Sequence, residues 1–227
     1  MKKSVLIITC LLLGQITVHG QMLFMLHEKM KENKRVENIN ELIIRLTNMK
    51  NGRLIKENSS TKIIDRKLQN ACKNYEDGAF SVSFPIFKMH ADDDNTIANY
   101  YLARSYYFGQ GVIQNYMMAI NCFEKNKGYS LIDAHSLFFL SRCYRYGRGI
   151  AINVEKSDSL VFEAACRGLI DAIELLQIEK DMSRNDVIDW IISVLNTELE
   201  YIRQRRDAIE EELMKGIPDS VPKFGLG

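Results

Sequence analysis

The sequence predicts an all-α protein, a right-handed α/α solenoid of helical hairpins closed by a long C-terminal capping helix. A motif returns after 38 residues, apolar residues recur at helical spacing, and two of only three prolines lie in the last ten residues. A repeat of this length is typical of solenoids, in which each hairpin hides its apolar face by stacking on its neighbours. Because proline is sparse, the body of the chain is free to be helical.

The first twenty residues predict a secretory signal. Lys2 and Lys3 precede an apolar run, Val5–Leu13, and we expect cleavage before Gln21. A membrane anchor is the alternative, but this run is shorter than the roughly 20 apolar residues that cross a bilayer. A lipid-modified Cys10 is a third option. Cleavage makes the protein secreted or periplasmic, with no stable membrane insertion afterwards.

The charge pattern argues against nucleic acid and anionic membranes as partners. The formal net charge of the whole chain is +1, and removal of two lysines with the signal lowers it to −1. Basic and acidic residues are interspersed, without a basic block that would attract phosphate. With 46% hydrophobic residues, the remaining chain is able to bury a continuous core.

Residues 21–58 are predicted to be an N-terminal helical segment. Apolar spacing indicates a helix over Met22–Lys50 that breaks near Asn33–Val36, and Asn51-Gly52 ends it.

Residues 59–95 predict a degenerate first hairpin. Its first helix is capped by Ser60 or Thr61. Its second helix runs over Ala79–His90 and tolerates Pro85 only with a kink.

Residues 96–182 contain the two clear repeats. The repeated structural positions are Leu102, Tyr106, Gly109 and Gly111 in the first unit, and Leu140, Tyr144, Gly147 and Gly149 in the second. The predicted helix pairs are Thr96–Phe108 with Tyr116–Lys127, and Asp133–Tyr146 with Val154–Arg167. In each loop the first glycine ends a helix in the left-handed conformation, and the second lets the loop pass close to the next helix.

This Tyr-x-x-Gly-x-Gly pattern, with Ala164-Ala165 closing the second unit, resembles the Sel-one-like repeat family of secreted bacterial type, a solenoid class related to the tetratricopeptide repeats. Ser141 departs from the glycine that the family prefers, and Asn126-Lys127 replaces an alanine pair. The resemblance implies a non-enzymatic adaptor or scaffold that holds a protein or peptide.

Residues 183–215 predict one long helix that starts at Ser183 with Asp186 three residues on, and a flexible tail is expected at 216–227. A seam with steps of four and three residues runs along this helix through Ile188, Ile192, Leu195, Leu199, Ile202, Arg206, Ile209 and Leu213. The helix either caps the solenoid or forms a homo-oligomeric coiled coil through residues 188–213. We favour the cap, because Arg206 interrupts the seam.

A binding groove is expected along the first helix of each repeat, which lines the concave face of such solenoids. Helix positions that the repeat pattern does not use are Tyr101, Arg104, Tyr107 and Phe108, followed by Phe139, Arg142, Arg145 and Tyr146. Arg104 and Arg142 are one period apart. Aromatic residues and arginines are favoured at recognition surfaces.

Catalytic and metal-binding signals are weak, so we expect no cofactor and no enzyme activity. The histidines have no metal-ligand spacing. Gly109-Gln110-Gly111 joins two helices instead of following a strand, which argues against a nucleotide loop. Asp92-Asp93-Asp94-Asn95 lacks the glycine and distal glutamate of a calcium loop and is interpreted as a solvated turn.

Ser59-Ser60-Thr61-Lys62 formally matches the Ser-x-x-Lys pattern of a nucleophile. Some cysteine-rich secreted relatives of the repeat family have been associated with β-lactam binding or hydrolysis. This is the alternative function, but the usual Ser-Asp-Asn and Lys-Thr-Gly partners are absent and a helix cap explains these residues.

The cysteines that follow the signal are Cys72, Cys122, Cys143 and Cys166. Cys122 and Cys143 lie on helices expected to pack together, so a Cys122–Cys143 disulfide is the preferred pairing. Four unpaired core thiols are the alternative, because cysteine buries like a small hydrophobic residue.

Overall fold

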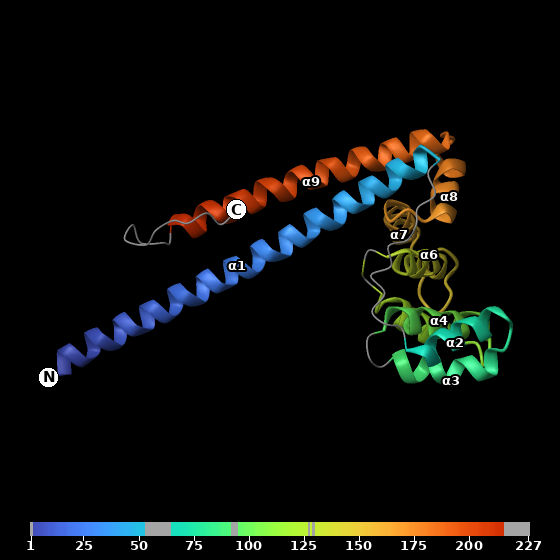
Figure 1. Ribbon diagram of the computed structural model, residues 1–227, viewed down its shortest axis with the longest axis horizontal. Helices are drawn as coiled ribbons and strands as arrows, with labels where there is room; N and C mark the ends of the chain where they lie inside the picture. The colour runs from blue at the N-terminus through green and yellow to red at the C-terminus, as the bar shows by residue number, and fades with distance from the viewer. Residues whose placement is uncertain (1, 53–64, 92–94, 127, 129, 216–227) are drawn as a thin grey trace. The chain divides into compact units, whose positions relative to one another are not determined.

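The structure, a computed structural model, describes residues 2–52, 65–91, 95–126, 128 and 130–215, with side chains from residue 23 onward. These residues form nine α-helices and no strands, which confirms the all-α class. The helices are α1 (Lys2–Lys50), α2 (Arg66–Glu76), α3 (Phe80–Ala91), α4 (Thr96–Phe108), α5 (Tyr116–Phe123), α6 (Leu131–Tyr146), α7 (Val154–Cys166), α8 (Ile170–Lys180) and α9 (Arg184–Lys215) (Figure 1).

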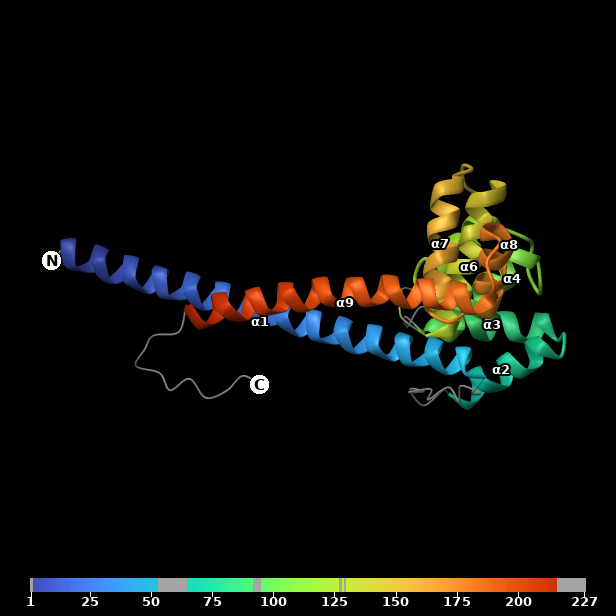
Figure 2. The ribbon, with the colours of Figure 1, turned by 90° about the horizontal axis from the view of Figure 1, so that it is seen from above.

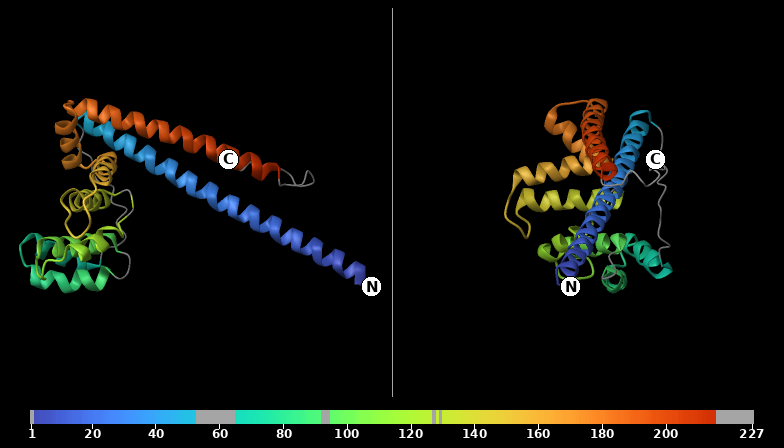
Figure 3. Two further views of the ribbon diagram at one scale, coloured as in Figure 1. Left: turned by 180° about the vertical axis from the view of Figure 1, so that it is seen from behind. Right: turned by 90° about the vertical axis from the view of Figure 1, so that its left-hand side faces the viewer.

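The chain folds as two compact units. One is Leu42–Ile192, which contains α2 to α8, and the other combines Met1–Glu41 with Ser193–Gly227. In the Leu42–Ile192 unit each helix from α2 to α8 packs on the next in chain order, and α4 also contacts α6. Figures 2 and 3 show α6 and α7 side by side. Large apolar side chains that are fully buried, Phe87, Phe123 and Ile173 among them, fill this unit.

The two repeat loops have the same backbone geometry. Gly109 ends α4 at φ 71° and Gly147 ends α6 at φ 66°, the left-handed conformation that the sequence predicts. In the first loop the Asn115 N–H donates to the Tyr106 carbonyl over 2.9 Å, and the second loop repeats this bond one period later. Asn115 also caps α5 through its side chain. The predicted bounds of the first repeat helix, Thr96–Phe108, are confirmed.

The second glycine of each loop approaches the preceding hairpin, so the prediction that it faces the next helix is wrong. A Cβ added at Gly111 would lie 2.5 Å from the carbonyl oxygen of Phe80, the first residue of α3. A Cβ at Gly149 would lie 2.7 Å from the Cβ of Tyr116, the first residue of α5. Each loop therefore lies directly against the helix start one hairpin earlier.

The predicted break near Asn33–Val36 is absent, because α1 is continuous from Lys2 to Lys50. This segment contains no glycine or proline that would interrupt the helix. The helix also continues across the Gly20-Gln21 bond, where signal cleavage remains a prediction. Within the described part of the chain, no helix is both long enough and apolar enough to cross a membrane.

Helix α5 is shorter than predicted and ends at Phe123, and Lys127 lies outside the described residues. Asn126, in the turn that follows, is buried. Its Nδ2 donates to the Thr96 carbonyl over 3.1 Å and to the Ser136 hydroxyl over 2.9 Å. These bonds hold the turn that replaces the last helical residues and satisfy the Nδ2 donor of Asn126, while its buried Oδ1 has no hydrogen-bond partner among the described residues.

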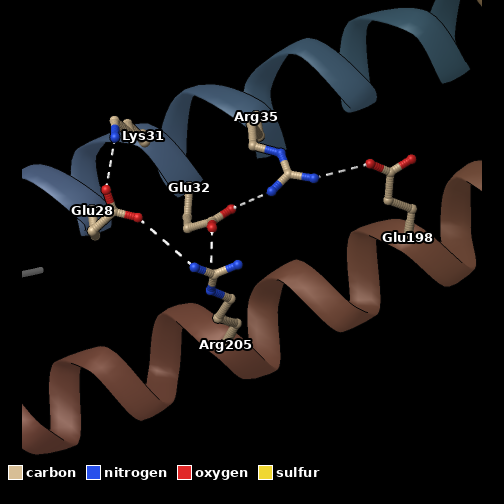
Figure 4. A network of polar contacts seen from close by, with 6 residues as sticks. All are labelled: Glu28, Lys31, Glu32, Arg35, Glu198 and Arg205. Atoms are coloured by element: carbon tan, nitrogen blue, oxygen red, sulfur yellow. Dashed lines mark hydrogen bonds and ion pairs between the residues drawn. The ribbon is translucent and has the colours of Figure 1, made fainter.

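In the unit of Met1–Glu41 and Ser193–Gly227, α1 and α9 run side by side in opposite directions (Figures 1 and 2). Charged side chains join the two helices (Figure 4). Glu32 of α1 is 3% exposed and lies 3.1 Å from Arg35 Nη1 and 3.5 Å from Arg205 Nε. Arg35 also contacts Glu198 of α9 over 3.2 Å. The buried carboxylate is therefore compensated from both helices.

The start and end of α9 match the prediction. The Ser183 hydroxyl accepts from the Asp186 N–H over 3.2 Å and donates to the Asp186 carboxylate over 2.6 Å, and the helix ends at Lys215. In the same unit Leu195, Leu199 and Ile202 are buried. The seam of α9 thus has α1 as its neighbour within a single chain.

Candidate functional site

A groove of about 560 Å³ lies among α2, α4, α6 and α8. We call it the aromatic groove. Its lining residues are Glu76, Tyr100, Tyr101, Arg104, Leu131, Ile132, His135, Phe138, Phe139, Arg142 and Asp171. It combines aromatic side chains with two arginines and two carboxylates, a set that serves recognition better than covalent chemistry.

Arg104 is fixed in the wall of the groove. Its guanidinium carbon lies 5.1 Å from the ring centre of Tyr75, 5.6 Å from that of Tyr100 and 5.7 Å from that of Tyr101. Its Nη1 is 3.2 Å from Glu76 Oε1. Burial raises the pKa of Tyr75 to about 12, so this phenol is neutral at physiological pH. The Arg104 charge is therefore paired with Glu76 and held over aromatic faces.

Arg142, one period after Arg104, has a different environment. Its side chain is exposed, and its guanidinium carbon lies 5.9 Å from the ring centre of Phe138. No hydrogen bond or ion pair joins it to any described residue, while Arg104 has a carboxylate partner. The two arginines of the predicted ladder are thus not equivalent.

The apolar wall of the groove rests on the core. Phe139 is half-buried and stacks on Phe123, with ring centres 5.3 Å apart and planes 4° from parallel. Tyr107 meets Phe139 edge to face at 5.2 Å. Because Phe123 is fully buried, the position of Phe139 is set by core packing.

The structure brings four of the eight predicted groove positions together: Tyr101, Arg104, Phe139 and Arg142 line the groove. The other four lie elsewhere. Tyr107 is 2% exposed and hydrogen-bonds with Arg148, and Arg145 forms ion pairs with Asp158 and Glu179. Phe108 and Tyr146 are exposed outside the lining.

Sequence reasoning missed several lining residues. Glu76 lies on α2 in the degenerate hairpin, and Asp171 lies on α8. Neither helix is followed by the Gly-x-Gly loop of the repeats, so the 38-residue period did not place these two residues. Tyr100 and Phe138 are adjacent to predicted positions and follow from the same helices. Tyr107, which was predicted for the groove, lies instead four residues after the fully buried Ala103 and therefore on the same buried face of α4.

Other chemical candidates give no site. Among the described residues, no three His, Cys, Asp or Glu side chains gather to hold a metal ion. The Ser59–Lys62 motif and residues 92–94 of the acidic turn lie outside the described residues. Asn95, which follows that turn, caps α4 by accepting from the Ile97 and Ala98 N–H groups.

Cys72, Cys122, Cys143 and Cys166 are thiols in the structure, and the Cys122–Cys143 bridge is not formed. Burial raises the pKa of both Cys72 and Cys143 to about 11. Both groups are therefore protonated at neutral pH, and the reactive thiolate is scarce.

We expect Cys143 to be alkylated far more slowly in the folded protein than in denaturant at pH 8, because its raised pKa and burial suppress the thiolate. The rate should rise only as the pH approaches 11. Mass spectrometry after timed alkylation measures both rates. Fast labelling of folded Cys143 would contradict the expectation, and a label-resistant pair in denaturant without reductant would reveal the disulfide.

In comparisons with known proteins, no family model matches the chain and no curated protein shows significant similarity to it.

Proposed function

We propose that this chain is an exported, non-enzymatic protein-interaction module, an adaptor or scaffold that holds a peptide segment of a partner protein in the aromatic groove. The main support is the aromatic groove, in which Tyr101, Phe139 and Arg142 line one space. The described residues form no metal-binding cluster. Rigid aromatic surface with arginine gives contact area at low entropic cost.

The proposed architecture is an α/α solenoid of the Sel-one-like kind. Its support is the equal geometry of the two loops, with left-handed glycines and matching Asn115 and Asn153 hydrogen bonds 38 residues apart. Export to the periplasm or the cell exterior rests on the sequence of residues 1–20.

A homo-oligomer through the C-terminal helix has less support. The seam residues Leu195, Leu199 and Ile202 are already buried in a single chain. A second copy would have to displace α1 and break ion pairs such as Arg205 to Glu32.

We expect Arg142→Ala to weaken capture of the partner by about tenfold or more, because a charge-assisted hydrogen bond is worth about 1.5–3 kcal/mol. The melting temperature should not change, since Arg142 is exposed and has no ion pair. Arg104→Ala should lower both binding and stability, because Arg104 packs on three tyrosines.

Affinity capture from the cell envelope, read by mass spectrometry, tests this expectation. Arg145→Ala is the matched control, because Arg145 is an arginine of the same helix that lies outside the groove lining. A partner retained by wild type and Arg145→Ala but lost by Arg142→Ala supports the groove. Equal recovery with all three chains would move the binding surface elsewhere.

A further inference from the structure

We propose that the partner segment is acidic and that Arg142 receives one of its Asp or Glu carboxylates. This inference rests on the proposed function, and it names the chemistry that the groove selects. Four charged side chains line the groove, and they differ in how far other groups of the protein compensate their charges. They are Glu76, Arg104, Arg142 and Asp171.

Three of these charges have local compensation. Arg104 and Glu76 form an ion pair of 3.2 Å, and Arg104 is also held over tyrosine rings. Asp171 lies in the first turn of α8, where no side chain caps the helix. A carboxylate is stabilised at that end of a helix by the exposed N–H groups and the helix dipole. Asp171 and Arg142 both lack a hydrogen bond or ion pair with a described residue, but Asp171 has this helix end, whereas Arg142 has neither a carboxylate partner nor a helix terminus.

The surroundings of Arg142 suit a bound carboxylate. The guanidinium carbon lies 5.9 Å from the centre of the Phe138 ring, and its five N–H donors have no hydrogen-bond partner among the described residues. Arginine pairs with carboxylates through two parallel hydrogen bonds. A bound peptide that covers Phe138 and Phe139 would remove water from around such a pair and so strengthen it.

The remaining lining favours a peptide over a small acid. Phe139 offers apolar surface near Arg142, Leu131 and Ile132 offer it about three helical turns away at the start of α6, and the groove spans residues from four helices. An acidic segment with apolar neighbours would bury those neighbours on the wall while its carboxylate meets Arg142.

The test selects random peptides, displayed on phage, against the whole protein and its variants. We expect wild type to enrich peptides with Asp or Glu at a fixed position. Changing that residue to Asn or Gln in the best synthetic peptide should weaken binding by at least tenfold, measured by calorimetry. Arg142→Glu should lose this peptide and instead enrich Lys or Arg.

Arg203→Glu is the control, because Arg203 is an exposed arginine of α9 and its reversal changes net charge equally. It should select the same acidic peptides as wild type. Another outcome is that the selected peptides lose binding to Phe138→Ala but show no preference for Asp or Glu. In that case the acidic inference fails, and the proposal of a peptide-binding groove stands. If no peptide is enriched, or binding ignores Phe138 and Arg142, both proposals fail.

Discussion

Replacing Gly111 with alanine is expected to lower the free energy of unfolding by about 3 kcal/mol and the melting temperature by about 10 °C. Gly111 has a φ of 75°, where an L side chain is strained. Its new Cβ would also lie 2.5 Å from the Phe80 carbonyl oxygen, so the loop or the start of α3 must shift. Thermal unfolding followed by circular dichroism measures the loss.

Gly78→Ala separates the two causes. Gly78 has a φ of 85°, but no atom outside its neighbours lies within 4 Å of an added Cβ. Alanine at this position should therefore lower the free energy of unfolding by about 1 kcal/mol, the cost of the backbone strain alone. Equal losses at Gly78 and Gly111 would show that the contact with Phe80 has no energetic weight.

Phe123→Ala is expected to have a still larger effect, a loss of about 4 kcal/mol in the free energy of unfolding. Phe123 is fully buried and stacks on Phe139, so truncation leaves a cavity under the wall of the aromatic groove. Peptide affinity should fall in parallel, because Phe139 loses its support. Urea unfolding and calorimetric titration below the melting transition measure the two effects.

Phe123→Leu is the matched variant, since it keeps most of the volume and should cost about 1 kcal/mol. A double-mutant cycle with Phe139→Ala tests whether the two rings are coupled. Additive losses would show that the stack does not hold the groove wall, and the predicted fall in affinity would then lack a cause.

Local chemistry explains why the sequence predicted parts of the fold well. Gly109 and Gly147 end helices in a conformation that few other residues adopt, and Asn95 caps α4, so the bounds of that helix follow from adjacent residues. The bounds of α5 depend on Asn126, whose partners Thr96 and Ser136 are distant in sequence. Such side-chain partners leave no periodic signal.

The candidate site shows the same division. The 38-residue period placed Arg104 and Arg142 on corresponding helices, and both line the groove. Periodicity treats them as equivalent, but Glu76 comes from the irregular hairpin and compensates only Arg104. Arg145 was misplaced because its partners Asp158 and Glu179 lie on α7 and α8, beyond the reach of a pattern within one helix.

The close approach of Gly111 and Gly149 to the preceding hairpin has a consequence for how this chain is able to diverge. These contacts involve backbone atoms of Phe80, Tyr116 and Met117 and the Cβ of Tyr116, an atom that every residue except glycine has, so they place few demands on which side chains occupy the helices. Spacing between adjacent hairpins is then preserved while residues such as Arg142 are exchanged. The same frame would accommodate a new partner through a few substitutions in the groove, provided that both glycines are kept.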